Sequence, residues 1–143
     1  MKIEKKASAV WTGSIKDGGG TISTETRVLK EAPYGFRSRF EGGPGTNPEE
    51  LIGAAHAGCF SMAFSLMLGE AGFTPDKIET HATVTLEKIG DGFEITASHL
   101  DVKASIPNID QSKFDEIAAM AKVNCPLSKL MKAKITMDAV LES

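Results

Sequence analysis

The most constraining feature of the sequence is a run of 19 residues, 51–69, that contains no Asp, Glu, Lys or Arg. Thr46 or Asn47 can cap a helix before this run, Pro48 suits its first turn, and Gly72 can end it in the left-handed conformation. A helix that is apolar on nearly every side must be buried on nearly every side. The pattern therefore predicts a central helix around which the rest of the chain is organised.

A run of this length could also cross a membrane. Three glycines, two serines and His56 lie within it, however, and the rest of the chain offers amphipathic strands that need a helix to cover them. We therefore expect a buried helix and no membrane span. The opening segment, MKIEKKASAV, is charged and alternating without the apolar region of a signal peptide, which favours a cytoplasmic protein.

Length and charge exclude several classes of protein. With 143 residues, the chain has the size of a single domain, residues 1–143. The net charge is −3, from 16 Lys and Arg against 19 Asp and Glu, and both signs are mixed along the chain. Because no basic arm or stripe is present, nucleic acid is not an expected partner.

Hydrophobic periodicity predicts the remaining elements, because strands alternate with period two and helices repeat with period 3.6. The Gly18-Gly19-Gly20 run favours a hairpin turn over a phosphate cradle, since no GK[ST] ending and no helix follows it. A change of parity near Ser98 predicts a bulge or a break in its strand. The predicted order is β-β-β-α-β-β-α-α-β, with strands near 3–12, 21–26, 35–41, 82–87, 93–106 and 135–141 and later helices near 112–121 and 126–131.

One sheet can cover only one side of the central helix, so its other side needs a second partner. In a chain this short, the simplest partner is another copy of itself. We therefore expect an intertwined homodimer. Small residues spaced by four, Gly53, Ala57 and Ser61, would let the two copies of the helix approach closely.

The two cysteines lie 66 positions apart and match neither a CxxC motif nor a zinc-ligand pattern. By itself, Cys59 is most simply a small buried hydrophobe. Cys125 lies at the start of a predicted short helix, whose dipole lowers a thiol pKa, so local sequence ranks it as the more activated thiol. His56, three residues before Cys59, could form a Cys–His pair, but a hydrogen-bonded core histidine is favoured. The three histidines show no metal-binding spacing.

Arg37 and Arg39 share one face of the predicted strand at 35–41, and a solvated face is the favoured interpretation. An inward arginine would need an acid, for which Glu49 and Glu50 are candidates. Glu49 lies ten residues before Cys59 on the predicted helix, which places them about 15 Å apart along its axis. Joint action of Glu49 and Cys59 would therefore need a return loop or the partner subunit.

Three segments, PYGFRSRFEGG, TNPEELIGAAHAGCFSMAFSLMLGEAGFTP and NCPLSKLMKA, closely resemble the OsmC/Ohr family of thiol peroxidases. The resemblance extends over essentially the whole chain. It implies an α/β (α+β type) OsmC-like fold, with two sheets around long central helices in an intertwined homodimer and active sites at the dimer interface. The implied activity is thiol-dependent reduction of organic hydroperoxides, and more weakly of hydrogen peroxide, to alcohols and water in oxidative or osmotic stress defence.

The resemblance also implies roles for four residues. Cys59 corresponds to the peroxidatic thiolate and Cys125 to the resolving cysteine, which together form an intramolecular disulfide. Arg39 corresponds to the arginine that stabilises the thiolate, and Glu49 to the acid that holds this arginine. No bound cofactor and no metal are implied, and an external dithiol reductant of the dihydrolipoyl type restores the thiols.

The family therefore reverses the local ranking of the two thiols, because an arginine in a dry pocket can lower a thiol pKa more than an exposed helix end does. An apolar lining would suit an alkyl peroxide; the candidates are Phe60, Met62, Phe64 and either Tyr34 or Phe36. Two other classes of function stay open. The chain could be a redox sensor that uses the disulfide as a switch, or a hydrophobic ligand-binding protein in which the cysteines are incidental.

Overall fold

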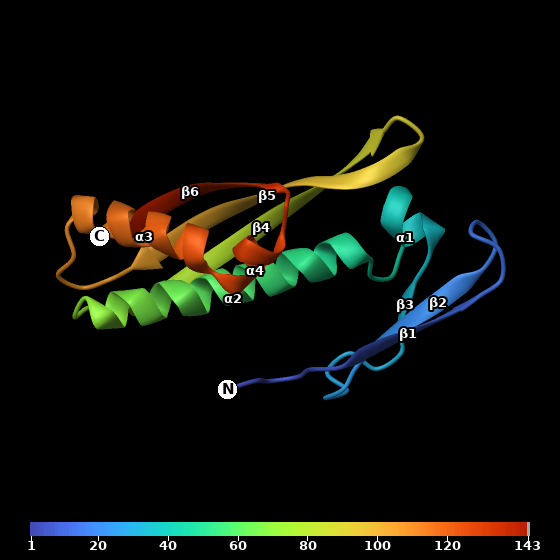
Figure 1. Ribbon diagram of the computed structural model, residues 1–143, viewed down its shortest axis with the longest axis horizontal. Coiled ribbons are helices and arrows are strands. Elements are labelled where there is room, and N and C mark those ends of the chain that lie inside the picture. Colours follow the sequence, from blue (N-terminus) through green and yellow to red (C-terminus); the bar gives the residue numbers. More distant parts are fainter. Residues whose placement is uncertain (143) are drawn as a thin grey trace. The chain divides into compact units, whose positions relative to one another are not determined.

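A computed structural model describes residues 1–142 and divides the chain into two compact units, Met1–Leu51 and the part from Ile52 onward (Figure 1). Each unit contains one three-stranded sheet. The prediction that residues 1–143 form a single domain stays a prediction.

The first unit contains an antiparallel sheet in the order β1-β2-β3, made of β1 (Ala7–Thr12), β2 (Gly19–Thr24) and β3 (Ala32–Tyr34). The glycine run leads from β1 into β2, as predicted, although β2 already begins inside it. Gly20 has no room for a side chain, because a Cβ atom there would lie 2.6 Å from the Tyr34 ring.

The strand predicted over 35–41 is wrong, because this segment forms the short helix α1 (Phe36–Phe40). The Ser38 hydroxyl accepts a hydrogen bond from the Gly35 N–H at 2.9 Å and lies 2.8 Å from the Thr46 carbonyl oxygen, so it satisfies backbone groups at the helix start. Phe36 and Phe40 still share a side, with ring centroids 5.0 Å apart. Residues i and i+4 share a face in both a strand and a helix, so the alternation did not distinguish the two.

The predicted central helix is confirmed as α2 (Pro48–Glu70), but its predicted burial on nearly every side is not found in the described chain, where 28% of its most apolar window is buried. The Asn47 side chain accepts a hydrogen bond from the Glu50 N–H at 2.7 Å, which identifies Asn47 as the cap. Gly72 follows the helix with a φ angle of +89°, the left-handed conformation expected of a stop.

The second unit contains a sheet in the order β4-β5-β6, made of β4 (Lys77–Ile89), β5 (Gly92–Ser105) and β6 (Lys134–Glu142). β4 and β5 form an antiparallel hairpin, whereas β6 runs parallel to β5. The crossover from β5 to β6 contains α3 (Gln111–Asn124) and α4 (Pro126–Leu130), which confirms the two helices predicted there. The observed order contains the extra helix α1 (Phe36–Phe40) in place of the strand predicted over 35–41, and its third strand is β3 (Ala32–Tyr34), which was not predicted.

The predicted irregularity in β5 is a bulge rather than a break. Thr85 of β4 pairs with Ala97 and the next residue, Leu86, pairs with Ile95, so Thr96 is the extra residue. The bulge therefore lies two residues before Ser98, where it was predicted. After it, Ser98 and the even-numbered residues Leu100, Val102 and Ala104 are buried.

The core of the second unit joins α2, α3 and the sheet. The Phe64 ring of α2 meets the Phe114 ring of α3 edge-on, with centroids 5.8 Å apart. The buried apolar residues form one cluster: Phe60, Phe64, Leu68, Leu100, Val102, Ala104, Ile106, Phe114, Ile117, Ala118, Ala121 and Cys125.

The stripe of small residues on α2 faces β4 and not another copy of the helix, so this part of the prediction is wrong. A Cβ atom on Gly53 would lie 3.5 Å from the Val84 side chain and 3.7 Å from the Ala82 carbonyl oxygen. The Ser61 hydroxyl lies 2.8 Å from the Thr80 hydroxyl. The small side chains therefore let α2 lie close to its own sheet.

Candidate active site

The two cysteines lie on different helices of the second unit. Cys59 is in the middle of α2 and half-buried, whereas Cys125 is fully buried at the junction of α3 and α4. The Cys125 N–H donates to the Ala121 carbonyl oxygen at 3.0 Å as the last bond of α3, and Pro126 starts α4 at once. A proline in the first turn of a helix keeps φ helical without losing a backbone bond, which suits Pro126 to the start of α4 directly after Cys125.

This turn brings the two thiols together. The Cys59 and Cys125 side chains share a hydrogen bond, and the Leu127 backbone N–H donates to the Cys59 sulfur. Both cysteines are free thiols. The two thiols are therefore neighbours.

Three effects act on the pKa of Cys59. Burial is the largest and raises the pKa, the Leu127 N–H lowers it, and the neighbouring Cys125 thiol raises it. The net result is a pKa above the ordinary value of a thiol. These contacts disfavour the thiolate, and a nearby positive charge would favour it.

Arg39 of α1 and Glu49 of α2 form a tight ion pair in the first unit. Arg39 Nε lies 3.1 and 3.2 Å from the two carboxylate oxygens, and Nη2 lies 2.7 Å from Oε1. The Glu49 residue is buried, whereas the Arg39 side chain stays 37% exposed. Arg37 instead reaches Glu41 at 3.9 Å on the surface. Arg39, and not Arg37, therefore pairs with a buried acid. That acid is Glu49 and not Glu50.

Arg39 also lines an apolar pocket of about 280 Å³ within the first unit. Its lining includes two of the predicted residues, Tyr34 and Phe36, together with Trp11, Ile15, Gly35 and Phe40. The other predicted lining residues lie elsewhere: Phe60 and Phe64 are fully buried core residues and Met62 is exposed on α2. The prediction that these three residues line the substrate site therefore stays a prediction.

His56 is a hydrogen-bonded core histidine, as favoured from the sequence. It has no exposed surface, and its two ring nitrogens lie 2.7 Å from the Ser98 hydroxyl and 2.9 Å from the Ser128 hydroxyl. Burial lowers the pKa of His56. Because both nitrogens are occupied by serines, His56 is not placed to act as a base for Cys59.

A model of the family described as OsmC-like protein matches residues 41–140 of the chain. Peroxiredoxin OsmC of Escherichia coli (strain K12) is 59% identical over 143 residues, which cover 100% of each chain. The chain belongs to the OsmC family. Organic hydroperoxide resistance protein-like 2 of Staphylococcus epidermidis (strain ATCC 12228 / FDA PCI 1200), a more distant relative, is 32% identical over 135 residues, covering 90% of this chain and 93% of that one.

The fold agrees with OsmC-family membership. The crystal structure of the organic hydroperoxide resistance protein OhrB of Bacillus subtilis matches with a TM-score of 0.71 and 27% identity, covering 96% of this chain and 98% of that one. The OsmC-like protein of Mycoplasma pneumoniae has the same fold, with a TM-score of 0.78 at 16% identity over all of both chains. The predicted α/β (α+β type) fold class with two sheets is confirmed, whereas the intertwined homodimer stays a prediction. The roles predicted for Cys59, Cys125, Arg39 and Glu49 stay predictions.

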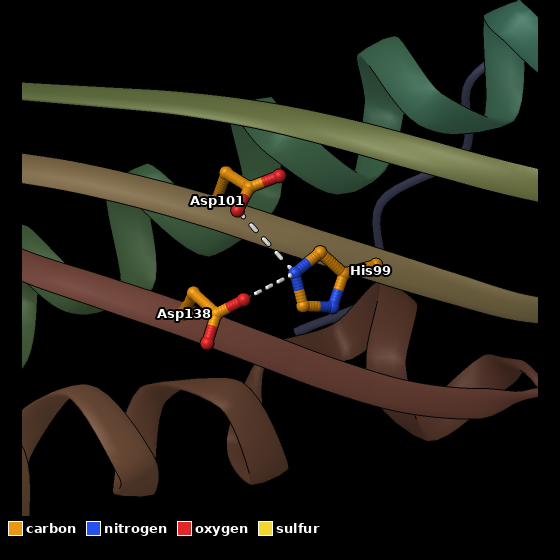
Figure 2. A group of neighbouring side chains, drawn as sticks. All are labelled: His99, Asp101 and Asp138. Carbon is orange, nitrogen blue, oxygen red and sulfur yellow. Dashed lines mark hydrogen bonds and ion pairs between the residues drawn. The ribbon is translucent and has the colours of Figure 1, made fainter.

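One group of side chains among residues 1–142 could hold a metal ion. Figure 2 shows His99 Nε2 between Asp138, at 3.0 Å, and Asp101, at 3.3 Å, and the three ligand atoms lie within 4.8 Å of one another. The second ring nitrogen of His99 contacts the Thr136 hydroxyl. Their mutual hydrogen bonds and ion pairs already account for this arrangement. The sequence did not reveal it, because Asp138 meets Asp101 only through the parallel pairing of β6 with β5.

Proposed function

We infer that this OsmC-family chain is a thiol peroxidase that reduces organic hydroperoxides in stress defence, with Cys59 as the peroxidatic and Cys125 as the resolving cysteine. The observation that carries the assignment of residues is the contact between the two free thiols, one half-buried and the other fully buried. Cys59 is the more exposed of the two residues, so we assign it the reaction with the hydroperoxide and assign Cys125 the second step.

The chemistry runs in three steps. The Cys59 thiolate attacks the outer peroxide oxygen, the O–O bond breaks, and the alkoxide leaves as the alcohol after it gains a proton, which leaves Cys59 as a sulfenic acid. The Cys125 thiolate then attacks the Cys59 sulfur, which forms the disulfide and displaces hydroxide. The hydroxide takes up a proton and leaves as water. An external dithiol, for which we propose a dihydrolipoyl-type protein, restores both thiols by exchange. No bound cofactor takes part in this sequence.

A cation is needed for the first step, because burial raises the pKa of Cys59. We assign this role to Arg39, following the family resemblance. The hydrogen bonds that Arg39 donates to Glu49 support the assignment, because they fix the guanidinium of a residue that is otherwise partly exposed. Glu49 therefore acts through Arg39 as a positioning residue.

The pocket beside Arg39 supports an organic substrate over hydrogen peroxide as the better one. Its aromatic and aliphatic lining offers apolar surface to an alkyl or aryl group, which hydrogen peroxide lacks. Hydrogen peroxide should accordingly be reduced more weakly.

The exposed side of α2 supports the homodimer. The Met62 residue is 77% exposed and the Leu66 residue is 65% exposed. In the most apolar stretch of α2, 28% is buried. By length and composition α2 could also cross a membrane. A second copy is the better cover, because the opposite side of the same helix carries the buried His56 and packs on a sheet. We propose a homodimer in the cytoplasm, with neither a membrane nor nucleic acid as partner.

The decisive experiment compares Cys59→Ser and Cys125→Ser by peroxide consumption and free-thiol counting. Catalytic consumption by the unaltered chain, none by Cys59→Ser and a single turnover by Cys125→Ser support the enzyme. Loss of two thiols per chain without turnover would instead support the redox sensor, and no loss of thiols would support the ligand-binding protein. Peroxide consumption by Cys59→Ser at the unaltered rate would refute the assignment.

A further inference from the structure

His56 is a fully buried ionisable residue to which the three-step mechanism gives no task. It joins three elements of the second unit, because it projects from α2, its Nδ1 meets Ser98 of β5, and its Nε2 meets Ser128 of α4. Burying an imidazole is costly unless both nitrogens are paired, and the two serines pair both.

His56 and Ser128 are each three residues from a cysteine in the sequence. His56 lies three residues before Cys59 on α2, and Ser128 lies three residues after Cys125 on α4. Residues three apart lie on the same side of a helix, about one turn away from each other. The hydrogen bond between His56 and Ser128 therefore ties the two cysteine-bearing segments together one turn from the thiols.

The short helix α4 has few other anchors. It contains only five residues, none of which is buried, and Leu127 packs on the core as a partly buried residue. Yet α4 follows directly after Cys125 and supplies the Leu127 N–H that donates to the Cys59 sulfur. A short segment with little buried surface depends more than usual on each polar contact.

We propose that His56 is a positioning residue that, through Ser128, holds α4 so that the Cys125 thiol and the Leu127 N–H both stay at the Cys59 sulfur. The proposal rests on the proposed function and deepens it. Without this tether, the Cys125 sulfur spends less time in line with the S–O bond of the Cys59 sulfenic acid, and closure of the disulfide slows. A sulfenic acid that waits longer can react with a second hydroperoxide, which oxidises it to the sulfinic acid while the hydroperoxide is reduced to its alcohol.

The pH dependence of the first step supplies a second readout. The Leu127 N–H stabilises the Cys59 thiolate, so loss of this contact favours the protonated thiol. Loosening α4 should therefore move the reaction of Cys59 with hydroperoxide to higher pH. A purely structural hydrogen bond elsewhere in the core would change the thermal midpoint without this effect.

The test compares Ser128→Ala with Ser98→Ala, two identical substitutions that each remove one partner of the same histidine. Ser128→Thr keeps a hydroxyl and serves as the conservative variant. The measurements are the rate of sulfenic acid formation against pH and the rate of disulfide closure, followed by trapping of the sulfenic acid with dimedone after one equivalent of an alkyl hydroperoxide. The thermal midpoint of each variant records the structural cost separately.

We expect Ser128→Ala to slow closure about tenfold and to shift the first step to higher pH. Ser98→Ala should leave both rates within about threefold of the unaltered chain, and Ser128→Thr should restore closure. Closure in Ser128→Ala as fast as in the unaltered chain, or equal slowing in Ser98→Ala, would overturn the positioning role alone. Absence of any trapped sulfenic acid and of any disulfide in the unaltered chain would instead overturn the proposed function.

Discussion

Replacing Glu49 by Gln tests the Arg39–Glu49 pair with a minimal change of shape. Glu49 holds Arg39 by three charge-assisted hydrogen bonds, of which the shortest is 2.7 Å. Gln keeps one carbonyl oxygen but loses the charge, and a hydrogen bond to a charged group is worth about 1 kcal/mol more than a neutral one. Because Arg39 is 37% exposed, water partly replaces what is lost, so we expect a net weakening of about 1.5 kcal/mol.

If this weakening is fully expressed in the positioning of Arg39, kcat/KM for an organic hydroperoxide should fall about tenfold, since 1.4 kcal/mol is a factor of ten. The alkylation rate of Cys59 against pH gives an independent measurement, because a less ordered arginine stabilises the thiolate less. Its midpoint should move to higher pH in Glu49→Gln.

Glu50→Gln is the matched control. It removes the same charge from the same first turn of α2, where an acid stabilises the helix by about 0.3–1 kcal/mol. Glu50 is exposed and accepts its hydrogen bond from Thr46 at 2.7 Å, whereas Arg39 donates to Glu49. It should therefore change kcat/KM by less than about threefold. An equal loss of activity in both variants would refute the reasoning, since the effect would then come from the helix end.

Three further predictions follow from the helix α2. Because burial lowers the pKa of His56 below 6.5, the folded chain resists a proton that the unfolded chain binds, so stability should be lost as the pH falls below about 6.5. The fall in thermal midpoint between pH 7.5 and 5.5 should be smaller in His56→Asn, and an equal fall would contradict this. If the chain is the proposed homodimer, Leu66→Glu should convert it to a monomer in sedimentation experiments, whereas Val123→Glu on the exposed surface of α3 should not. Gly53→Ala should change the free energy of unfolding, measured with urea, by less than about 1 kcal/mol, whereas Gly53→Leu should lower it by about 1–3 kcal/mol. Gly69→Leu should change it little, because the space around Gly69 is open.

The parts of the fold that could be predicted from the sequence are those that depend on local chemistry. The cap at Asn47, the stop at Gly72 and the start of α4 at Pro126 each need only neighbouring residues, and all three are present. The bulge was predictable as well, because burial of Leu100 requires a change of parity somewhere before it. Its exact residue, Thr96, was not, since one extra residue can be accommodated at several positions of a strand.

The errors come from patterns that fit two geometries. Phe36 and Phe40 share a face in a strand and in a helix, and only the hydrogen bonds of Ser38 decide between them. Gly53 and Ser61 form a stripe that permits close approach, but a stripe does not identify what approaches. In the structure the neighbour is β4, whose place beside α2 depends on the whole second unit.

The candidate site illustrates the same limit at the level of chemistry. Local sequence placed an activating helix end at Cys125, because that residue precedes α4 in the chain. In the structure the Leu127 N–H of α4 donates to the sulfur of Cys59, 66 positions away from Cys125 in the sequence. A hydrogen bond acts on whatever lies within its reach in space, so α4 stabilises the thiolate of one cysteine while its first turn carries the other. One short helix therefore contacts Cys59 and directly follows Cys125, and under the proposed mechanism its attachment to α2 through His56 would affect both steps of the reaction.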